Sequence, residues 1–191
     1  CESRKDCIVV ISPERGDVVA NDSYSGKQAE DVDVSLILGG DNNGTVVEHI
    51  IGNICESRKD CIVVISPERG DVVANDSYSG KQAEDVVAYR DTLTSTSYAV
   101  MDAGWKYQYD KYNDIQRYVP ANGDTAGLMV RSDLTRDPWY SPAGFNRGIM
   151  KNVTRLAFNP KKAERDVLYK NGINPVVTFP GQGTVLFGDK T

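Results

Sequence analysis

Short apolar runs alternate with helix-like segments along this chain, and that alternation restricts the fold more than any other feature. Residues 34–38, 61–65 and 98–101 are continuous apolar runs of strand length. Between them, apolar residues recur every three to four positions at 46–54 and 83–93, the spacing of helices that bury one face. Strands joined by helices form parallel sheets, and continuous apolar runs fit strands covered on both faces. We therefore predict an α/β fold with a small, mostly parallel sheet and helices on both faces.

The starts of these two helices carry recognisable capping patterns. Thr45 is followed three residues later by Glu48, and Ser79 is followed by Gln82 at the same spacing. A hydroxyl residue with Glu or Gln three positions on is the pattern of a capping box. We therefore predict that the first helix begins at Thr45 and the second at Ser79.

The first 32 residues recur without one change at 55–86. Repeated structural units usually diverge at exposed positions, and repeat arrays usually contain three or more units. The identity here includes charged and polar positions, so we interpret residues 1–32 as an artefactual copy, with a very recent duplication as the alternative. An intact mass near 21.0 kDa, the mass of all 191 residues, would contradict the artefact interpretation. The informative chain is 33–191, of which 33–104 holds the strand-helix core.

After Gly104 the pattern changes to a loop-rich α+β region. Trp105, Tyr107 and Tyr109 alternate, which predicts an extended segment with one aromatic face. The remainder of 105–150 is rich in Gly, Pro, Asn and Asp, and we expect long loops with short helices there.

The segment 151–191 predicts one helix followed by a β-hairpin. Asn159 and Pro160 fit the cap and first position of a helix over 161–170, which should end at Asn171-Gly172. Apolar runs at 176–179 and 184–187 flank a Gly-rich turn, which is typical of a hairpin.

Composition excludes two classes of partner. Asp and Glu number 27 against 22 Lys and Arg, a net charge of −5, whereas a nucleic-acid surface is normally basic. No segment approaches the roughly 20 consecutive apolar residues that span a bilayer. We expect neither direct nucleic-acid binding nor membrane insertion. The chain opens with Cys1 and not with Met, so we expect a fragment of a soluble protein.

The segment 39–45 resembles a phosphate-binding loop between a strand and a helix. It has the glycines and a Thr, but the Lys that would reach the outer phosphates is missing, and Asp41 would repel them. We interpret the segment as a tight turn that needs glycines.

Three acidic residues follow the three predicted strands: Asp41, Glu68 and Asp102. The carboxyl ends of parallel strands lie at one edge of a sheet, and converging carboxylates bind Mg²⁺. A Mg²⁺- or nucleotide-dependent phosphoryl enzyme is therefore the alternative function. The simpler explanation is that acidic residues are common where helices begin, because the helix dipole favours them there.

No other set of residues suggests a metal, a cofactor or a catalytic site. The one histidine, His49, cannot complete a zinc site with Cys55 and Cys61, since a structural zinc ion takes four ligands at short paired spacings. We expect the two cysteines to be reduced structural thiols. With one histidine, no Ser-His-Asp or Cys-His arrangement is supported.

Two strings rich in Pro, Gly and aromatic residues remain, at 137–148 and at 179–191. From the residues alone they are rigid loops that serve packing or an interface. The residues that we single out in them are Trp139, Pro142, Ala143, Gly144, Arg147, Pro180, Gly181, Gly183 and Gly188.

The first string from Pro138 to Gly148 (PWYSPAGFNRG) and the run at 172–191 (GINPVVTFPGQGTVLFGDKT) resemble the signature stretches of contractile tail sheath proteins. The segment 33–191 as a whole is similar to the sheath proteins of T-even-type phages. The resemblance implies a structural subunit and no enzyme. Such subunits polymerise around the tail tube and contract to drive the tube through the host cell envelope. The implied partners are neighbouring sheath subunits, the tail tube protein, and the baseplate and tail terminator proteins. The implied location is the virion tail, after assembly in the host cytoplasm. Residues 1–32 depart from the family pattern, and the family's terminal arms are missing.

Overall fold

A parallel β-sheet forms the centre of the computed structural model, which describes residues 8–10, 34–73 and 81–191. Its strands are β1 (Ile8–Val10), β2 (Leu36–Leu38), β3 (Ile62–Ile65), β4 (Ala99–Asp102) and β8 (Ile173–Asn174). They lie in the order β1-β2-β3-β4-β8, and every neighbouring pair is parallel. The three apolar runs of the sequence are therefore adjacent strands, as predicted.

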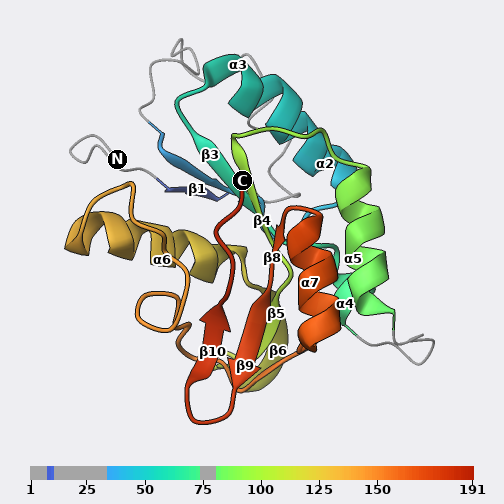
Figure 1. The fold of residues 1–191 in the computed structure, drawn as a ribbon, viewed down its shortest axis with the longest axis vertical. Coiled ribbons are helices and arrows are strands. Elements are labelled where there is room, and N and C mark those ends of the chain that lie inside the picture. The colour runs from blue at the N-terminus through green and yellow to red at the C-terminus, as the bar shows by residue number, and fades with distance from the viewer. Residues whose placement is uncertain (1–7, 11–33, 74–80) are drawn as a thin grey trace.

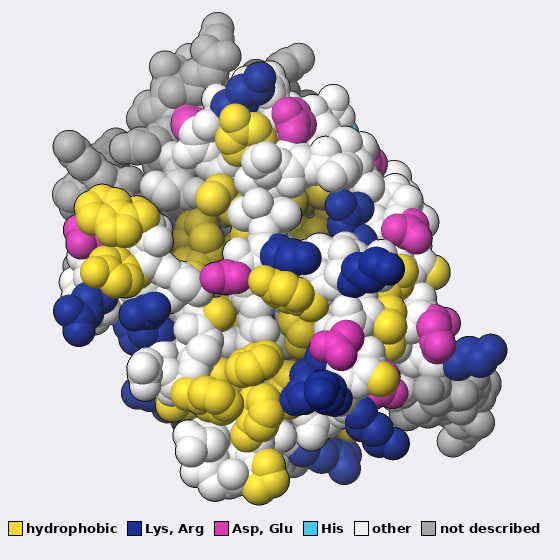
Figure 2. Space-filling model, viewed as in Figure 1, with side chains coloured by type: hydrophobic (Ala, Val, Ile, Leu, Met, Phe, Trp, Pro, Cys, Tyr) yellow, Lys and Arg dark blue, Asp and Glu magenta, His cyan; other side chains and the backbone are white. Residues whose placement is uncertain are grey.

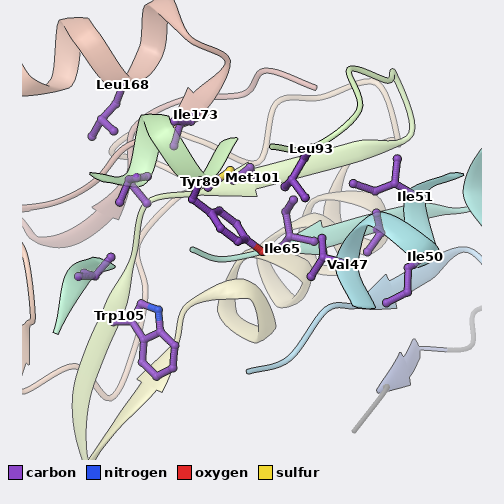
Figure 3. Close-up of a cluster of buried hydrophobic side chains, with 14 of the residues drawn as sticks. Val47, Ile50, Ile51, Ile65, Tyr89, Leu93, Met101, Trp105, Leu168 and Ile173 are labelled. Atoms are coloured by element: carbon purple, nitrogen blue, oxygen red, sulfur yellow. The ribbon is translucent and has the colours of Figure 1, made fainter. Parts of the chain in front are cut away.

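Successive side chains of the strands point to opposite faces, and each face is covered by helices (Figure 1). Leu36 and Val64 pack on one face against Ala126 of α6 (Asn122–Thr135). On the other face, Ile37, Val63 and Ile65 join the main core. The helices of that core are α2 (Gly44–His49), its π-helical continuation η3 (Ile50–Cys55), α5 (Gln82–Asp91) and α7 (Lys162–Lys170). Figure 3 shows this cluster, which includes Ile50, Ile51, Tyr89 and Leu168. The predicted sheet with helices on both faces is confirmed.

The first helix begins differently from the prediction. Its cap is Asn43, whose side-chain oxygen accepts from the Val46 N–H at 3.0 Å. The Gly44 N–H donates to Oε1 of Glu68 at 2.8 Å, so a distant carboxylate satisfies a second free donor of the helix end. The predicted Thr45–Glu48 capping box is wrong, because Glu48 instead accepts from Thr94.

The two helices that follow η3 in the chain are short. The chain continues from η3 into α3 (Glu56–Arg58), and α4 (Arg69–Val72) follows β3. Helix α5 begins at Gln82. The predicted cap at Ser79 lies outside the described residues.

The region after Gly104 contains more regular structure than predicted. Strands β5 (Trp105–Asp110), β6 (Ile115–Pro120) and β7 (Arg155–Leu156) form an antiparallel sheet in the order β6-β5-β7. The expectation of long loops with short helices is wrong for 115–135, since β6 is followed by the 14-residue helix α6. Two glycines lower the helix propensity of α6, but its packing against the sheet outweighs that preference. Residues 136–150 are irregular, as predicted.

The helix and the hairpin predicted for the last segment are confirmed, but the short strands β7 and β8 and one cap differ from the prediction. Helix α7 ends at Lys170 with Asn171 as its C-cap, and Gly172 has a φ of +80°, a conformation that favours glycine. Asn159 is not the cap of α7. Its side-chain oxygen accepts from the Thr178 N–H at 2.9 Å, so it is bound to the edge of β9 (Val176–Phe179). Strand β9 pairs with β10 (Gly183–Leu186) in the predicted antiparallel hairpin.

Deleting residues 1–32 should leave the thermal midpoint unchanged or raise it. Strand β1 from the duplicated segment is the outermost strand of the sheet, paired only with β2 among the described strands. The sheet order leaves no central position for a second copy of β3, and an added edge strand leaves backbone groups open to pairing with other chains. Differential scanning calorimetry of both chains tests this. A large fall in the midpoint would show that the copy is integrated into the core.

Candidate assembly surface

The two signature strings lie against each other in space. The Gly144 N–H donates to the Leu186 carbonyl at 2.9 Å, and the Leu186 N–H donates to the Gly148 carbonyl at 2.8 Å. The Gly148 N–H in turn donates to the Gly144 carbonyl at 2.7 Å. The loop after α6 is therefore joined to the free edge of β10 by backbone hydrogen bonds.

Close backbone contact explains why glycines stand at several of these positions. A Cβ on Gly148 would lie 2.6 Å from the Leu186 carbonyl oxygen, and Gly144 has a φ of +89°. A Cβ on Gly188 would lie 2.8 Å from the side-chain oxygen of Asn174, a fully buried residue. That oxygen accepts from the Lys190 N–H at 2.8 Å. Gly148 and Gly188 therefore serve packing within the chain, whereas backbone conformation selects glycine at position 144.

Arg147 fixes the turn of the first string. Its Nε donates to the Ser141 carbonyl at 2.7 Å, and its guanidinium lies 5.4 Å from the centre of the Tyr140 ring. The Arg147 carbonyl accepts from the guanidinium of Arg131 on α6. Ala143 packs against a small core that includes Leu128 and Leu186. These contacts join the loop to α6 and to this small core.

Trp139 is the most exposed of the large hydrophobic side chains in this loop. Its side chain is 78% exposed, and Leu134 at the end of α6 is 77% exposed. A groove of about 260 Å³ is lined by Trp139 together with Ile62 and Val100 of the sheet. Tyr140 and Pro142 also line the groove, as do Leu186 and the segment 188–191.

A second apolar surface is formed by three rings from different segments. Phe145, Phe179 and Phe187 have ring centres 5.1 to 5.7 Å apart. The guanidinium of Arg165 on α7 lies 5.5 Å from the Phe179 ring. Figure 2 shows hydrophobic side chains gathered in the lower part of the face, where Figure 1 places β9 and β10, beside Lys and Arg side chains. Sequence reasoning missed Arg165, because no local pattern links α7 to the hairpin.

The hairpin turn beside these rings is exposed. Pro180, Gly181 and Gly183 lie at the surface, and the two glycines have φ angles of +77° and +88°. No atom would meet a Cβ at either glycine, so backbone conformation and not space selects glycine there.

The structure does not bring the three predicted acidic residues to one site. Asp41 is exposed, Glu68 binds the start of α2, and Asp102 is fully buried and hydrogen-bonded within the chain. Among the described residues, no three His, Cys, Asp or Glu side chains are grouped to bind a metal ion.

Cys55 and Cys61 are free and buried, in agreement with the expected reduced thiols. Burial raises the pKa of the Cys55 thiol to about 12, which keeps it protonated and unreactive at neutral pH. In the described part of the chain, no helix is both long and apolar enough to cross a membrane.

Solved structures of contractile systems share this fold. The contracted helical sheath of the anti-feeding prophage has a TM-score of 0.60 at 15% identity, over 83% of this chain and 39% of that chain. The contracted PVC sheath complex of an extracellular contractile injection system has a TM-score of 0.61 at 21% identity, over 82% and 39%. A chain in the six-fold symmetrised baseplate of the anti-feeding prophage has a TM-score of 0.57 at 15% identity, over 82% and 37%.

Sequence comparison gives a nearer relation. The tail sheath protein of Vibrio phage KVP40 is 49% identical over 158 residues, which cover 77% of this chain and 24% of that protein. The tail sheath protein of Enterobacteria phage T4 is 41% identical over 176 residues, which cover 85% and 27%. This chain spans about a quarter of the length of these curated relatives. Residues 27–191 match the family described as the phage tail sheath protein central domain, and the chain therefore belongs to the phage tail sheath family.

Proposed function

We propose that this chain is part of a structural subunit of a phage contractile tail sheath and acts in the virion tail. The match of 27–191 to the sheath family carries the proposal. The family is structural, and the separation of Asp41, Glu68 and Asp102 gives the alternative phosphoryl enzyme no site.

The sheath subunits polymerise around the tail tube, and contraction drives the tube through the host envelope. The partners in this proposal are neighbouring subunits, the tail tube protein, and the baseplate and tail terminator proteins, with assembly in the host cytoplasm. The shared fold with chains of a helical sheath and of a baseplate supports neighbouring subunits and the baseplate as partners.

The exposed part of the signature strings is the best candidate for contacts with partners. Trp139 and Tyr140 stand on a loop whose backbone is already fixed, so their binding would cost little conformational entropy. Trp, Tyr and Arg are the side chains that most often dominate binding energy in interfaces. Pro142 lies in the same groove, and Pro180 lies beside the three rings. We assign the buried glycines of these strings to packing.

Replacing Trp139 by Ala should reduce tube formation by a full-length sheath protein that contains this segment, without unfolding it. Negative-stain electron microscopy at matched concentrations measures the number and length of the tubes. Tyr112→Ala is the matched control, because Tyr112 is 86% exposed on the turn between β5 and β6. If Trp139→Ala formed tubes in normal number and length, Trp139 would not be part of the interface between subunits. Failure of the unaltered protein to form tubes would contradict the sheath function itself.

The 191-residue chain alone should be monomeric at micromolar concentration. Relatives are about four times longer, so most of a subunit's surface is absent from this chain. The exposed rings and Trp139 give small separate patches, and stable interfaces bury on the order of 1,600 Å² in total. Sedimentation velocity tests this, and stable rings or tubes would show that this domain carries the assembly energy by itself.

A further inference from the structure

Asp102 is a carboxyl group at the end of β4 that is fully buried. Its Oδ1 accepts from the Ser66 hydroxyl at 2.8 Å and from the Gly104 N–H at 3.0 Å. Its Oδ2 accepts from the Thr125 hydroxyl at 3.1 Å. The carboxyl group therefore has three donors, which come from the end of β3, the turn after β4 and the first turn of α6.

The same network holds the beginning of α6. The Asn122 N–H donates to the Ser66 oxygen at 3.0 Å, and the Asn122 side chain donates to the Gly40 carbonyl at 2.8 Å. Asn122 is buried as well. Asp102 is thus at the centre of a polar cluster by which the sheet holds the first turn of α6. The other end of α6 contacts the signature loop through Arg131.

The charges around Asp102 do not compensate it. From α6, the like charge of Asp124 faces the carboxyl group. Lys106 of β5 lies four residues after Asp102 in the sequence, but its Nζ forms an ion pair with Asp124 at 2.8 Å and not with Asp102. The β3 end contributes the neutral Ser66, and β8 contributes the neutral Asn174, which pairs with Asp102 in the sheet. No ion pair among the described residues includes Asp102.

Desolvation by burial has the largest effect on the pKa of the Asp102 carboxyl group. Burial raises the pKa of Asp102 to about 7, and Asp124 adds to the rise, while the three hydrogen bonds act in the opposite direction. An isolated charge in a protein interior is strongly unfavourable unless it is paired, and this one has only neutral donors.

We propose that Asp102 is a proton-binding site that adjusts how firmly α6 is held on the parallel sheet. When the carboxylate takes up a proton, its new O–H donates to the hydroxyl oxygen of Thr125 or Ser66, and the buried charge disappears. The hydroxyl that receives this hydrogen bond then turns its own proton away from Asp102. When the proton leaves, the charge remains buried among neutral donors with no ion-pair partner among the described residues, and the attachment of α6 weakens.

The direction of the pH effect follows from this. In the unfolded chain Asp102 ionises near its ordinary pKa of about 3.9, whereas in the folded chain it retains its proton to about 7. Between these values the folded state binds more protons than the unfolded state. The stabilising contribution is fully present below about pH 4, is lost as pH rises towards 7, and does not return above it.

The test compares the unaltered chain with Asp102→Asn, which is neutral at every pH. Urea unfolding from pH 4.5 to 8.5 gives the unfolding equilibrium constant of each chain. We expect the ratio of the unaltered chain's constant to that of Asp102→Asn to rise by about tenfold per pH unit between 4.5 and 6.5. The ratio should become constant above about 7.5, after a total change on the order of a hundredfold or more. A ratio that is flat or falls with pH would overturn the proposal.

Two further measurements keep the result tied to Asp102. Asp71→Asn is the matched control, because burial and the neighbouring Glu68 and Asp85 raise the pKa of Asp71 to about 6. That variant should lose only the contribution of Asp71, which ends near pH 6, and keep the contribution of Asp102, which extends to about pH 7. If Asp102→Asn fails to fold, carbon-13 NMR of the Asp102 carboxyl in the unaltered folded chain decides. A titration midpoint near 7 supports the proposal, and a midpoint near or below 4 overturns it.

Discussion

Gly148→Ala should lower the free energy of unfolding by about 3 kcal/mol. The added Cβ would lie 2.6 Å from the Leu186 carbonyl oxygen and 2.8 Å from the Gly144 nitrogen. Both are backbone atoms, so no side-chain rotation relieves the contact. Relief requires the loop to leave β10, which breaks hydrogen bonds that contribute a net ~0.5–1.5 kcal/mol each and adds overpacking of ~1–3 kcal/mol.

Urea denaturation followed by circular dichroism measures this effect. The control is Gly127→Ala, an exposed glycine of α6 where a Cβ would meet nothing within 4 Å. Because glycine disfavours a helix by about 1 kcal/mol relative to alanine, the control should stabilise the chain slightly. Equal stability of the two variants would mean that the loop is not fixed to β10 by this contact.

The parallel sheet could be predicted from the sequence because its strands carry a signal that does not depend on distant residues. A strand buried on both faces needs a continuous apolar run, and the runs at β2, β3 and β4 are such runs. The helix between β2 and β3 shows its buried face through Val47, Ile50 and Ile51. The order of these elements then restricts the topology to adjacent parallel strands.

The helix starts were predicted less well, because several side chains compete for the same free N–H groups. Asn43 lies two residues before the predicted cap and reaches the Val46 N–H, while Glu68 arrives from another loop. Glu48 and Asn159 fit local capping patterns, but the structure uses both to bind backbone groups of distant segments. Local spacing alone does not contain that information.

The sequence singled out two strings as the candidate surface but could not separate the roles of their residues. Sequence composition does not separate Gly188, which is packed against Asn174, from Gly181, which is exposed in a turn. It also cannot show that Arg165 of α7 covers the ring of Phe179. Asp102 was singled out as one of three converging acidic residues, but burial gives it a different environment from Asp41.

Trp105→Ala should have the largest effect of any single change considered for this chain, a loss of about 3–5 kcal/mol in the free energy of unfolding. Trp105 is 1% exposed and belongs to the main core. Its indole N–H donates to the Pro67 carbonyl at 2.8 Å, and its own carbonyl accepts from the Ala157 N–H at 2.8 Å. It therefore joins the end of β3 to the antiparallel sheet, and truncation removes core volume and leaves the Pro67 carbonyl without its donor.

The chain has two tryptophans, and Trp139→Ala supplies the natural control for this prediction. Trp139 is 78% exposed, so its loss should change stability by no more than about 0.5 kcal/mol. The emission of Trp139→Ala should be that of a buried indole, because Trp105 alone remains. Trp105→Phe separates the two parts of the effect, since a ring stays in the core while the hydrogen bond to Pro67 is lost. We expect its stability to fall between those of Trp105→Ala and the unaltered chain. If Trp105→Ala and Trp139→Ala were equally stable in urea, Trp105 would not join the two sheets as the structure places it.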